Sequence, residues 1–287
     1  MNGVGSAMQV CHVAPSQIGA LVEKMTLKTQ NTATIVHNLP TNFALKALNS
    51  GLAKAYNDYF TWRYSSSKNV LVLPIMGEMT AYSGWGFGAD FYEQALLSAA
   101  TDSDFVGAVL LIDSGGGMAD GCAKLSNAIN EFRKAKPIVS QFSYCASAAY
   151  YAASQCTESW IEDQSPSMVG SIGTLGILTS YTKYFEKEGV DVRVARATKS
   201  YDKASMNPYE ELPASDSPAM KDYQVMLDAC QREFEGAVKR GRAGKLTSDA
   251  VFTGKMYGAN DAIKLGLVDK KGSLLGAIKR VSQLSKS

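Results

Sequence analysis

Histidine is scarce in this 287-residue chain. The two histidines, His12 and His37, both lie in the N-terminal segment. A Ser-His-Asp triad would have to recruit one of them, so a lysine is the simpler general base for a nucleophilic serine elsewhere in the chain. In other respects the composition is ordinary, because an apolar share of 46% and a charged share of 20% are typical of a soluble globular protein.

The cysteines form no recognisable framework. They are odd in number, widely spread and without a Cys-x-x-Cys pair: Cys11, Cys122, Cys145, Cys156 and Cys230. This pattern argues against a disulfide scaffold and against a zinc site, and it favours a reducing compartment. We therefore expect neither a metal nor an organic cofactor.

Long apolar runs and dense basic stretches are also missing. No run approaches the roughly 18 apolar residues of a membrane-spanning helix. Residues Met1–Ser6 lack the basic start and apolar stretch of a signal peptide. A net charge of +2 without a stripe of Lys and Arg gives no indication of nucleic-acid binding. We expect a cytoplasmic protein, or one packed into an assembly formed there, with neither membrane nor nucleic acid as a partner.

The sequence changes character near residue 69. Residues 1–68 are predicted to be an N-terminal extension, with a helix-like apolar stripe over Pro40–Tyr59 and a polar linker at Ser65–Lys68. From Asn69 onward, strand-like and helix-like patterns alternate, which is typical of an α/β domain with a largely parallel sheet.

The individual elements of this domain follow from apolar runs and helical periodicity. We predict strands at Val70–Ile75 (closed by Gly77), Val106–Ile112 (broken by Gly115–Gly117), Ile138–Gln141 and Val192–Ala195. We predict helices at Phe91–Ala100, Ala119–Ala135, from about Ser147, and at Pro213–Lys239.

Ser147 is the first candidate for chemistry. It stands in the run Cys145–Tyr151, where small residues flank the hydroxyl just after the strand-like Pro137–Ser140. Nothing bulky would block a substrate carbonyl, and the start of a following helix offers free backbone N–H groups to an oxyanion. A serine at a helix start is, taken alone, far more often an N-cap. This segment by itself leaves both interpretations open.

Two further segments are candidates on weaker grounds. Gly115–Gly117 follow the apolar run Leu110–Ile112, and glycines there let a backbone approach a ligand closely. A plain tight turn is an equal alternative, and a phosphate loop is disfavoured because no Gly-Lys-Ser/Thr follows. Lys203 lies in the polar segment Ser200–Tyr209, where a lone lysine is nearly always a solvated charge.

Taken together and in this order, these segments resemble peptidase family S49, the signal peptide peptidase A family. The hallmarks of that family are a strand ending in Asn/Asp-Ser-Pro-Gly-Gly, then Ala-Ser-Gly-Gly-Tyr-Tyr, Gly-Ser-Ile/Leu-Gly, and a lysine five residues before a proline. The corresponding segments here are Asp113–Gly117, Ala146–Tyr151, Gly170–Gly173, Lys203 to Pro208, and a C-terminal signature at Val251–Asp269. The resemblance implies that 69–287 is an S49 peptidase domain with a Clp protease/crotonase-like fold, a mostly parallel sheet and flanking helices.

The resemblance also implies a role for each matching position. Ser147 matches the serine nucleophile and Lys203 the general base, with Lys199 as the competing lysine. Ser171 matches the hydroxyl that orients the lysine. The oxyanion donors are expected to be the amides of Ala148 and Gly116, with Gly117 as the alternative to Gly116.

This chain departs from the family pattern at two places. Gly115 replaces the usual proline, and Ala148-Ala149 replace Gly-Gly after the serine. Alanine keeps an amide donor in place if φ stays negative, so activity is expected to survive. Trp85, flanked by glycines, and Gly173 are the candidates for substrate contact.

The expected function is a serine endopeptidase with a Ser-Lys dyad. The Asn207–Pro213 run and the alanines after Ser147 resemble the phage branch of the family, whose members process scaffold or coat proteins during head maturation. This reading implies a polypeptide substrate, a homo-oligomer, and a cytoplasmic or prohead-associated location.

Several alternatives stay open. One is a cytoplasmic peptidase that clears signal peptides or other peptides. A second is a crotonase-like acyl-CoA enzyme, which would need neither Ser147 nor Lys203. A third is a non-catalytic assembly protein, and a fourth, weaker one is a nucleotide-binding module suggested by Gly84–Gly88.

Overall fold

The computed structural model describes residues 61–63, 69–83 and 88–287. The helix expected at Pro40–Tyr59, the linker at Ser65–Lys68, both histidines and Trp85 lie outside this part of the chain. Two compact units are present. One contains Thr174–Glu233, and the other contains the described residues up to Gly173 together with Phe234–Ser287.

The larger unit is built on one eight-stranded sheet with the order β1-β2-β3-β4-β5-β8, in which β6 pairs with β4 and β7 pairs with β6. The strands are β1 (Thr61–Arg63), β2 (Asn69–Met79), β3 (Phe105–Gly117), β4 (Ile138–Ala146), β5 (Glu158–Ile161), β6 (Met168–Gly170), β7 (Met256–Gly258) and β8 (Lys270–Lys271). All pairs are parallel except β1 with β2 and β6 with β7. The predicted α/β class with a mostly parallel sheet is confirmed. Three residues of the predicted N-terminal extension, those of β1, pair with this sheet.

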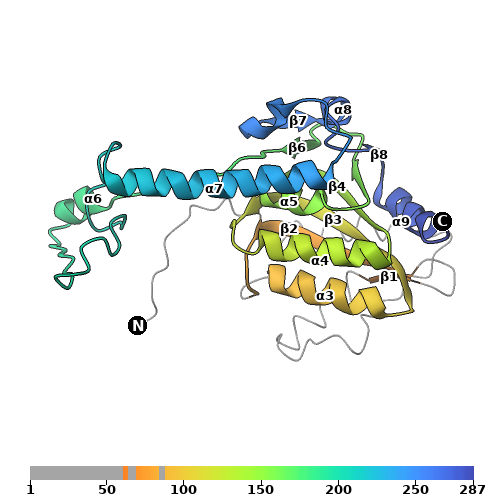
Figure 1. Cartoon of the computed structure of the whole chain (residues 1–287), viewed down its shortest axis with the longest axis horizontal. Helices are drawn as coiled ribbons and strands as arrows, with labels where there is room; N and C mark the ends of the chain where they lie inside the picture. The colour runs from red at the N-terminus through yellow and green to blue at the C-terminus, as the bar shows by residue number, and fades with distance from the viewer. Residues whose placement is uncertain (1–60, 64–68, 84–87) are drawn as a thin grey trace. The chain divides into compact units, whose positions relative to one another are not determined.

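Helices cover both faces of the sheet (Figure 1). They are α3 (Ala89–Thr101), α4 (Cys122–Ala135) and α5 (Ala148–Ala153) on one face and α9 (Leu274–Leu284) on the other. Successive residues of β2 show why, because Leu71 and Leu73 pack under the first group of helices whereas Val70 and Val72 pack under α9. Strands buried on both faces appear in the sequence as continuous apolar runs.

Two strands extend beyond their predicted ends. β2 was expected to close at Gly77 and β3 to break at Gly115, yet both continue, and they remain paired through Met79 and Gly117. A register shift between Met76 and Glu78 absorbs Gly77, whose φ is +73°. These glycines therefore form a bulge and a close strand contact instead of a turn.

The smaller unit carries α6 (Thr182–Lys187) and the first part of α7 (Pro218–Gly241). The Ser217 hydroxyl accepts the Met220 N–H at 3.3 Å, so Ser217 and Pro218 start α7 five residues after the predicted Pro213. The strand predicted at Val192–Ala195 is wrong: those residues form neither strand nor helix. A strand needs a neighbour to accept its backbone hydrogen bonds, and among the described residues none pairs with this segment.

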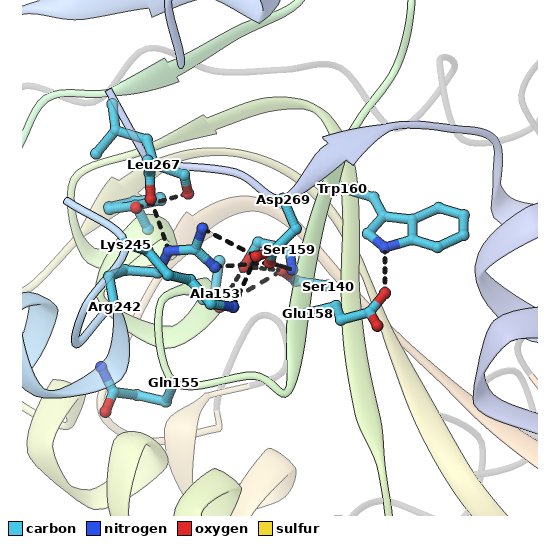
Figure 2. A network of polar contacts seen from close by, with 12 residues as sticks. Ser140, Ala153, Gln155, Glu158, Ser159, Trp160, Arg242, Lys245, Leu267 and Asp269 are labelled. Atoms are coloured by element: carbon cyan, nitrogen blue, oxygen red, sulfur yellow. Dashed lines mark hydrogen bonds and ion pairs between the residues drawn. The ribbon is translucent and has the colours of Figure 1, made fainter. Parts of the chain in front are cut away.

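A buried polar network joins the end of α7 to the C-terminal segment of the larger unit, as Figure 2 shows. The Arg242 side chain, only 1% exposed, donates to Asp269 Oδ2 at 2.7 Å and to the Gly266 carbonyl at 2.9 Å. Asp269 also accepts Lys245 Nζ at 2.6 Å and the Ser159 N–H at 2.7 Å. The 3-10 helix Asp249–Thr253, α8 (Ala259–Lys264) and β8 belong to the same unit as this network. Among the residues that the structure describes, no helix combines the length and apolar character needed to cross a membrane.

Candidate active site

Ser147 occupies a sharp turn between β4 and α5. It stands at the N-cap of α5 with φ 54° and ψ −126°, a backbone conformation that is strained for any residue other than glycine. Its side chain makes no capping hydrogen bond, whereas Ser248 and Ser273 each cap a helix in this unit. A strained serine between a strand and a helix, with its hydroxyl not used for capping, is the arrangement of an exposed nucleophile. The geometry favours this interpretation over a structural N-cap.

The backbone around Ser147 is anchored on β6. The Ser147 N–H donates to the Gly170 carbonyl at 2.9 Å, and the Ser147 carbonyl accepts the Tyr151 N–H at 3.0 Å. Ser171, the residue directly after β6, has φ 52° and donates its N–H to the Lys255 carbonyl at 2.9 Å. The Ser147 turn and Ser171 therefore both border the end of β6, at Gly170.

Gly116 lies directly against the Ser147 turn. A Cβ atom built on Gly116 would stand 2.7 Å from Ser147 Cβ and 2.9 Å from the Ala148 nitrogen, and its φ of +94° also favours glycine. The backbone of β3 is thus close enough to Ala148 for amides from both segments to face one ligand atom. Gly117 continues the same strand.

Ser114 holds this glycine segment in place. Its buried hydroxyl donates to the Gly77 carbonyl in the β2 bulge at 2.5 Å and accepts the Gly116 N–H at 3.1 Å. The signal for this role in the sequence is weak, because Ser114 is only one small residue before the glycines. The bulge at Gly77 that completes the contact has no signature in a single sequence.

The cysteine next to the site is not a competing nucleophile. Burial, with a smaller effect of Cys156, raises the pKa of the Cys145 thiol well above its usual value. Cys145 therefore stays protonated at neutral pH, and a thiol is a much weaker nucleophile than a thiolate. Burial also raises the pKa of Asp113, the residue that precedes Ser114.

Lys203 belongs to the smaller unit, which also contains Lys199. The Lys203 backbone N–H donates to the Ser200 carbonyl at 3.0 Å, and the Lys203 carbonyl accepts a hydrogen bond from Arg196 Nε at 2.6 Å. The roles of Arg196 and its partner Glu210 in this loop were not foreseen from the sequence, because both read as ordinary surface charges. Of the candidates for substrate contact, Gly173 packs against Gly254 and Trp85 lies outside the described residues.

Known proteins with similar sequences include two from phages. The head-tail preconnector protein GP5 of Enterobacteria phage P21 is 31% identical over 218 residues, which is 72% of this chain and 41% of that protein. The capsid assembly protease C of Escherichia phage lambda is 25% identical over 219 residues, 72% of this chain and 47% of that protein. Protease 4 of Haemophilus influenzae is 26% identical over 200 residues, 69% of this chain and 31% of that protein. The chain spans less than half the length of each of these relatives.

The family model of peptidase family S49 matches residues 130–287, a range that contains Ser147, Ser171 and Lys203. Gly116 and Gly117 precede the matched range, and Gly116 lies beside the Ser147 turn. This match extends over more than half of the chain, and the chain belongs to peptidase family S49.

Proposed function

We propose that this protein is a serine endopeptidase with Ser147 as nucleophile and Lys203 as general base. The observation that carries the proposal is the strained backbone of Ser147, whose hydroxyl is not used for capping and whose turn lies against Gly116. Membership of the S49 family supports it, because the matched range contains both residues and the motifs around them resemble those that carry the family's nucleophile and lysine.

The mechanism follows from the chemistry of a Ser-Lys pair. A free lysine has a pKa near ~10.4 and is protonated at neutral pH, so a lysine base must first be desolvated. The neutral Lys203 amine then accepts the Ser147 proton as Oγ attacks the scissile carbonyl, and it returns that proton to the leaving amine. In this proposal Ser171 orients the lysine by hydrogen bonding to its amine.

Two backbone amides would bind the oxyanion of the tetrahedral intermediate. Ala148, at the first position of α5, supplies one of them. The Gly116 N–H already donates to Ser114 Oγ, which favours Gly117 over Gly116 as the second donor. The loss of one such donor typically costs about 3–4 kcal/mol of transition-state stabilisation.

The proposed substrate is a scaffold or coat protein processed during phage head maturation. Support comes from the two phage relatives, one of which is a capsid assembly protease by name. Such a role implies a homo-oligomeric enzyme that acts in the cytoplasm or within the prohead. Gly173 would contribute to the substrate site through its position beside Gly254.

The test is labelling of the purified protein with a fluorescent fluorophosphonate, with cleavage of labelled casein measured in parallel. Wild type is compared with Ser147→Ala, Lys203→Ala and, as the matched control, Lys199→Ala. We expect labelling and cleavage to be lost in the first two variants and retained in the third.

Other outcomes would revise the proposal in defined ways. Labelling that persists in Lys203→Ala but is lost in Lys199→Ala would identify Lys199 as the general base instead of Lys203. Folded wild type that neither labels nor cleaves casein would contradict the peptidase assignment and would favour an acyl-CoA or non-catalytic role.

A further inference from the structure

One arginine ties together the turn that follows Lys203. Arg196 donates from Nε to the Lys203 carbonyl at 2.6 Å and from Nη2 to the Ala204 carbonyl at 2.9 Å. The same guanidinium forms two hydrogen bonds to the Glu210 carboxylate, at 2.9 and 2.5 Å. One side chain thus binds two consecutive carbonyls and one carboxylate, all from the smaller unit.

A second side chain completes this arrangement. The Asn207 amide donates to the Ala204 carbonyl at 2.8 Å and to Glu210 Oε2 at 2.5 Å, and its Oδ1 accepts the Tyr209 N–H at 2.9 Å. Hydrogen bonds from Arg196 and then Asn207 lower the pKa of Glu210 to about 2, so the carboxylate remains ionised throughout the working pH range of a peptidase. The contacts therefore persist without a titration step.

The turn held in this way is strained. Ala204 has φ 54°, although it carries a Cβ atom and has no polar side chain to compensate for the left-handed conformation. Such a conformation is unfavourable and persists only when surrounding contacts enforce it. The contacts at the Lys203 and Ala204 carbonyls are placed where they enforce it, immediately beside the proposed base.

We infer that Arg196 is a positioning residue for the reaction: it fixes the backbone of Lys203 so that the lysine amine leaves the turn in one direction. The Glu210 carboxylate holds the guanidinium, and Asn207 in turn donates to that carboxylate. The inference rests on the proposed role of Lys203 as general base. A lysine at position 196 would keep the charge but lacks the planar fork that reaches both carbonyls and the carboxylate together.

The experiment compares Arg196→Lys with wild type and with Arg193→Lys, an exposed arginine of the same segment. Fluorophosphonate titration first counts the reactive sites in each preparation, and casein cleavage is then expressed per titrated site. We expect Arg196→Lys to lower kcat per site by about 10- to 100-fold with KM changed less than twofold, because a displaced base slows the chemical step without weakening substrate contacts. Arg193→Lys is expected to match wild type.

Two results would overturn the inference. One is an unchanged kcat per site in Arg196→Lys. The other is a reduced number of titratable sites at an unchanged rate per site, which would show a purely structural role. If Arg196→Lys fails to fold, Glu210→Gln takes its place, with an expected loss of about 3- to 10-fold in kcat per site, and the absence of any loss would again overturn it. Failure of the proposed function is distinguishable from these results, because it would appear in wild type and Lys203→Ala without any Arg196 variant: wild type would not react, or Lys203→Ala would remain active.

Discussion

Substitution of Gly116 by alanine tests whether the close approach of β3 to the nucleophile matters for activity. The added Cβ atom would lie 2.7 Å from Ser147 Cβ, 2.8 Å from the Ala146 carbonyl oxygen and 2.9 Å from the Ala148 nitrogen. Ordinary van der Waals contact begins at 3.4 Å, so neighbouring atoms must retreat by about 0.5–0.7 Å. All three neighbours belong to the turn that carries the nucleophile.

The expected cost follows from that displacement. A misplacement of about 1 Å at a reacting group costs about 100-fold in rate, which corresponds to about 2.7 kcal/mol. The smaller shift here, scaled in proportion, predicts a loss of about 10- to 25-fold. Backbone strain at φ +94° would add roughly 1–2 kcal/mol of lost stability.

The assay is the second-order rate constant for fluorophosphonate labelling, with Gly115→Ala as the matched control. The nearest atom to a Cβ on Gly115 is Tyr144 Cε1 at 3.9 Å, so that variant has room and is expected to label within about twofold of wild type. A Gly116→Ala rate within threefold of the Gly115→Ala rate would refute the reasoning.

Two further predictions concern the buried network at the end of α7. Arg242→Met should lower the free energy of unfolding by about 3 kcal/mol, near the low end for a broken buried ion pair, because Lys245 still contacts Asp269. Urea titration measures this loss, and the control is the exposed Lys264→Met, which should cost less than about 0.5 kcal/mol. Equal urea midpoints for the two variants would contradict the prediction. The second is acid sensitivity. Burial alone would raise the pKa of Asp269, but hydrogen bonds from Arg242, Lys245 and the Ser159 N–H outweigh it and lower this pKa below its usual value. The carboxylate's contribution to stability is then full above the unfolded-state pKa of about 3.9 and declines as the pH falls below it. Urea midpoints from pH 6 to pH 3 should therefore fall more steeply in wild type than in Asp269→Asn, and parallel curves would argue against the network.

The sequence predicted the buried centre of the sheet well. Runs such as Val106–Ile112 are apolar at every position because β3 is covered on both faces. Helices α3 and α4 were found within a few residues of their ends, since each packs one apolar stripe on the sheet.

The errors have two physical origins. Strand ends at Gly77 and Gly115–Gly117 were missed because pairing with a neighbouring strand, and not side-chain propensity, continues β2 and β3 through the glycines. Short strands such as β6 and β8 contain too few residues for any pattern to appear. The strand expected at Val192–Ala195 had the right residues but no pairing partner among the described strands.

The candidate site divides in a similar way. Ser147, Ser171 and Lys203 could be proposed from the sequence because each lies in a segment that resembles a family hallmark. Ser114 and Arg196 act by holding backbone carbonyls and amides that are distant along the chain or belong to irregular loops. Contacts of that kind depend on the three-dimensional path of the loop, and a single sequence carries no signature for them.

The backbone conformation of Ser147 sets activity and stability against each other. At φ 54° and ψ −126° a serine carries a strain that glycine would largely relieve. A copy of this protein released from selection for catalysis would therefore gain stability, on the order of 1 kcal/mol, by the very substitution that removes the nucleophile. The serine at this position therefore costs stability, and thermal unfolding of Ser147→Gly beside Ser147→Ala would measure that cost.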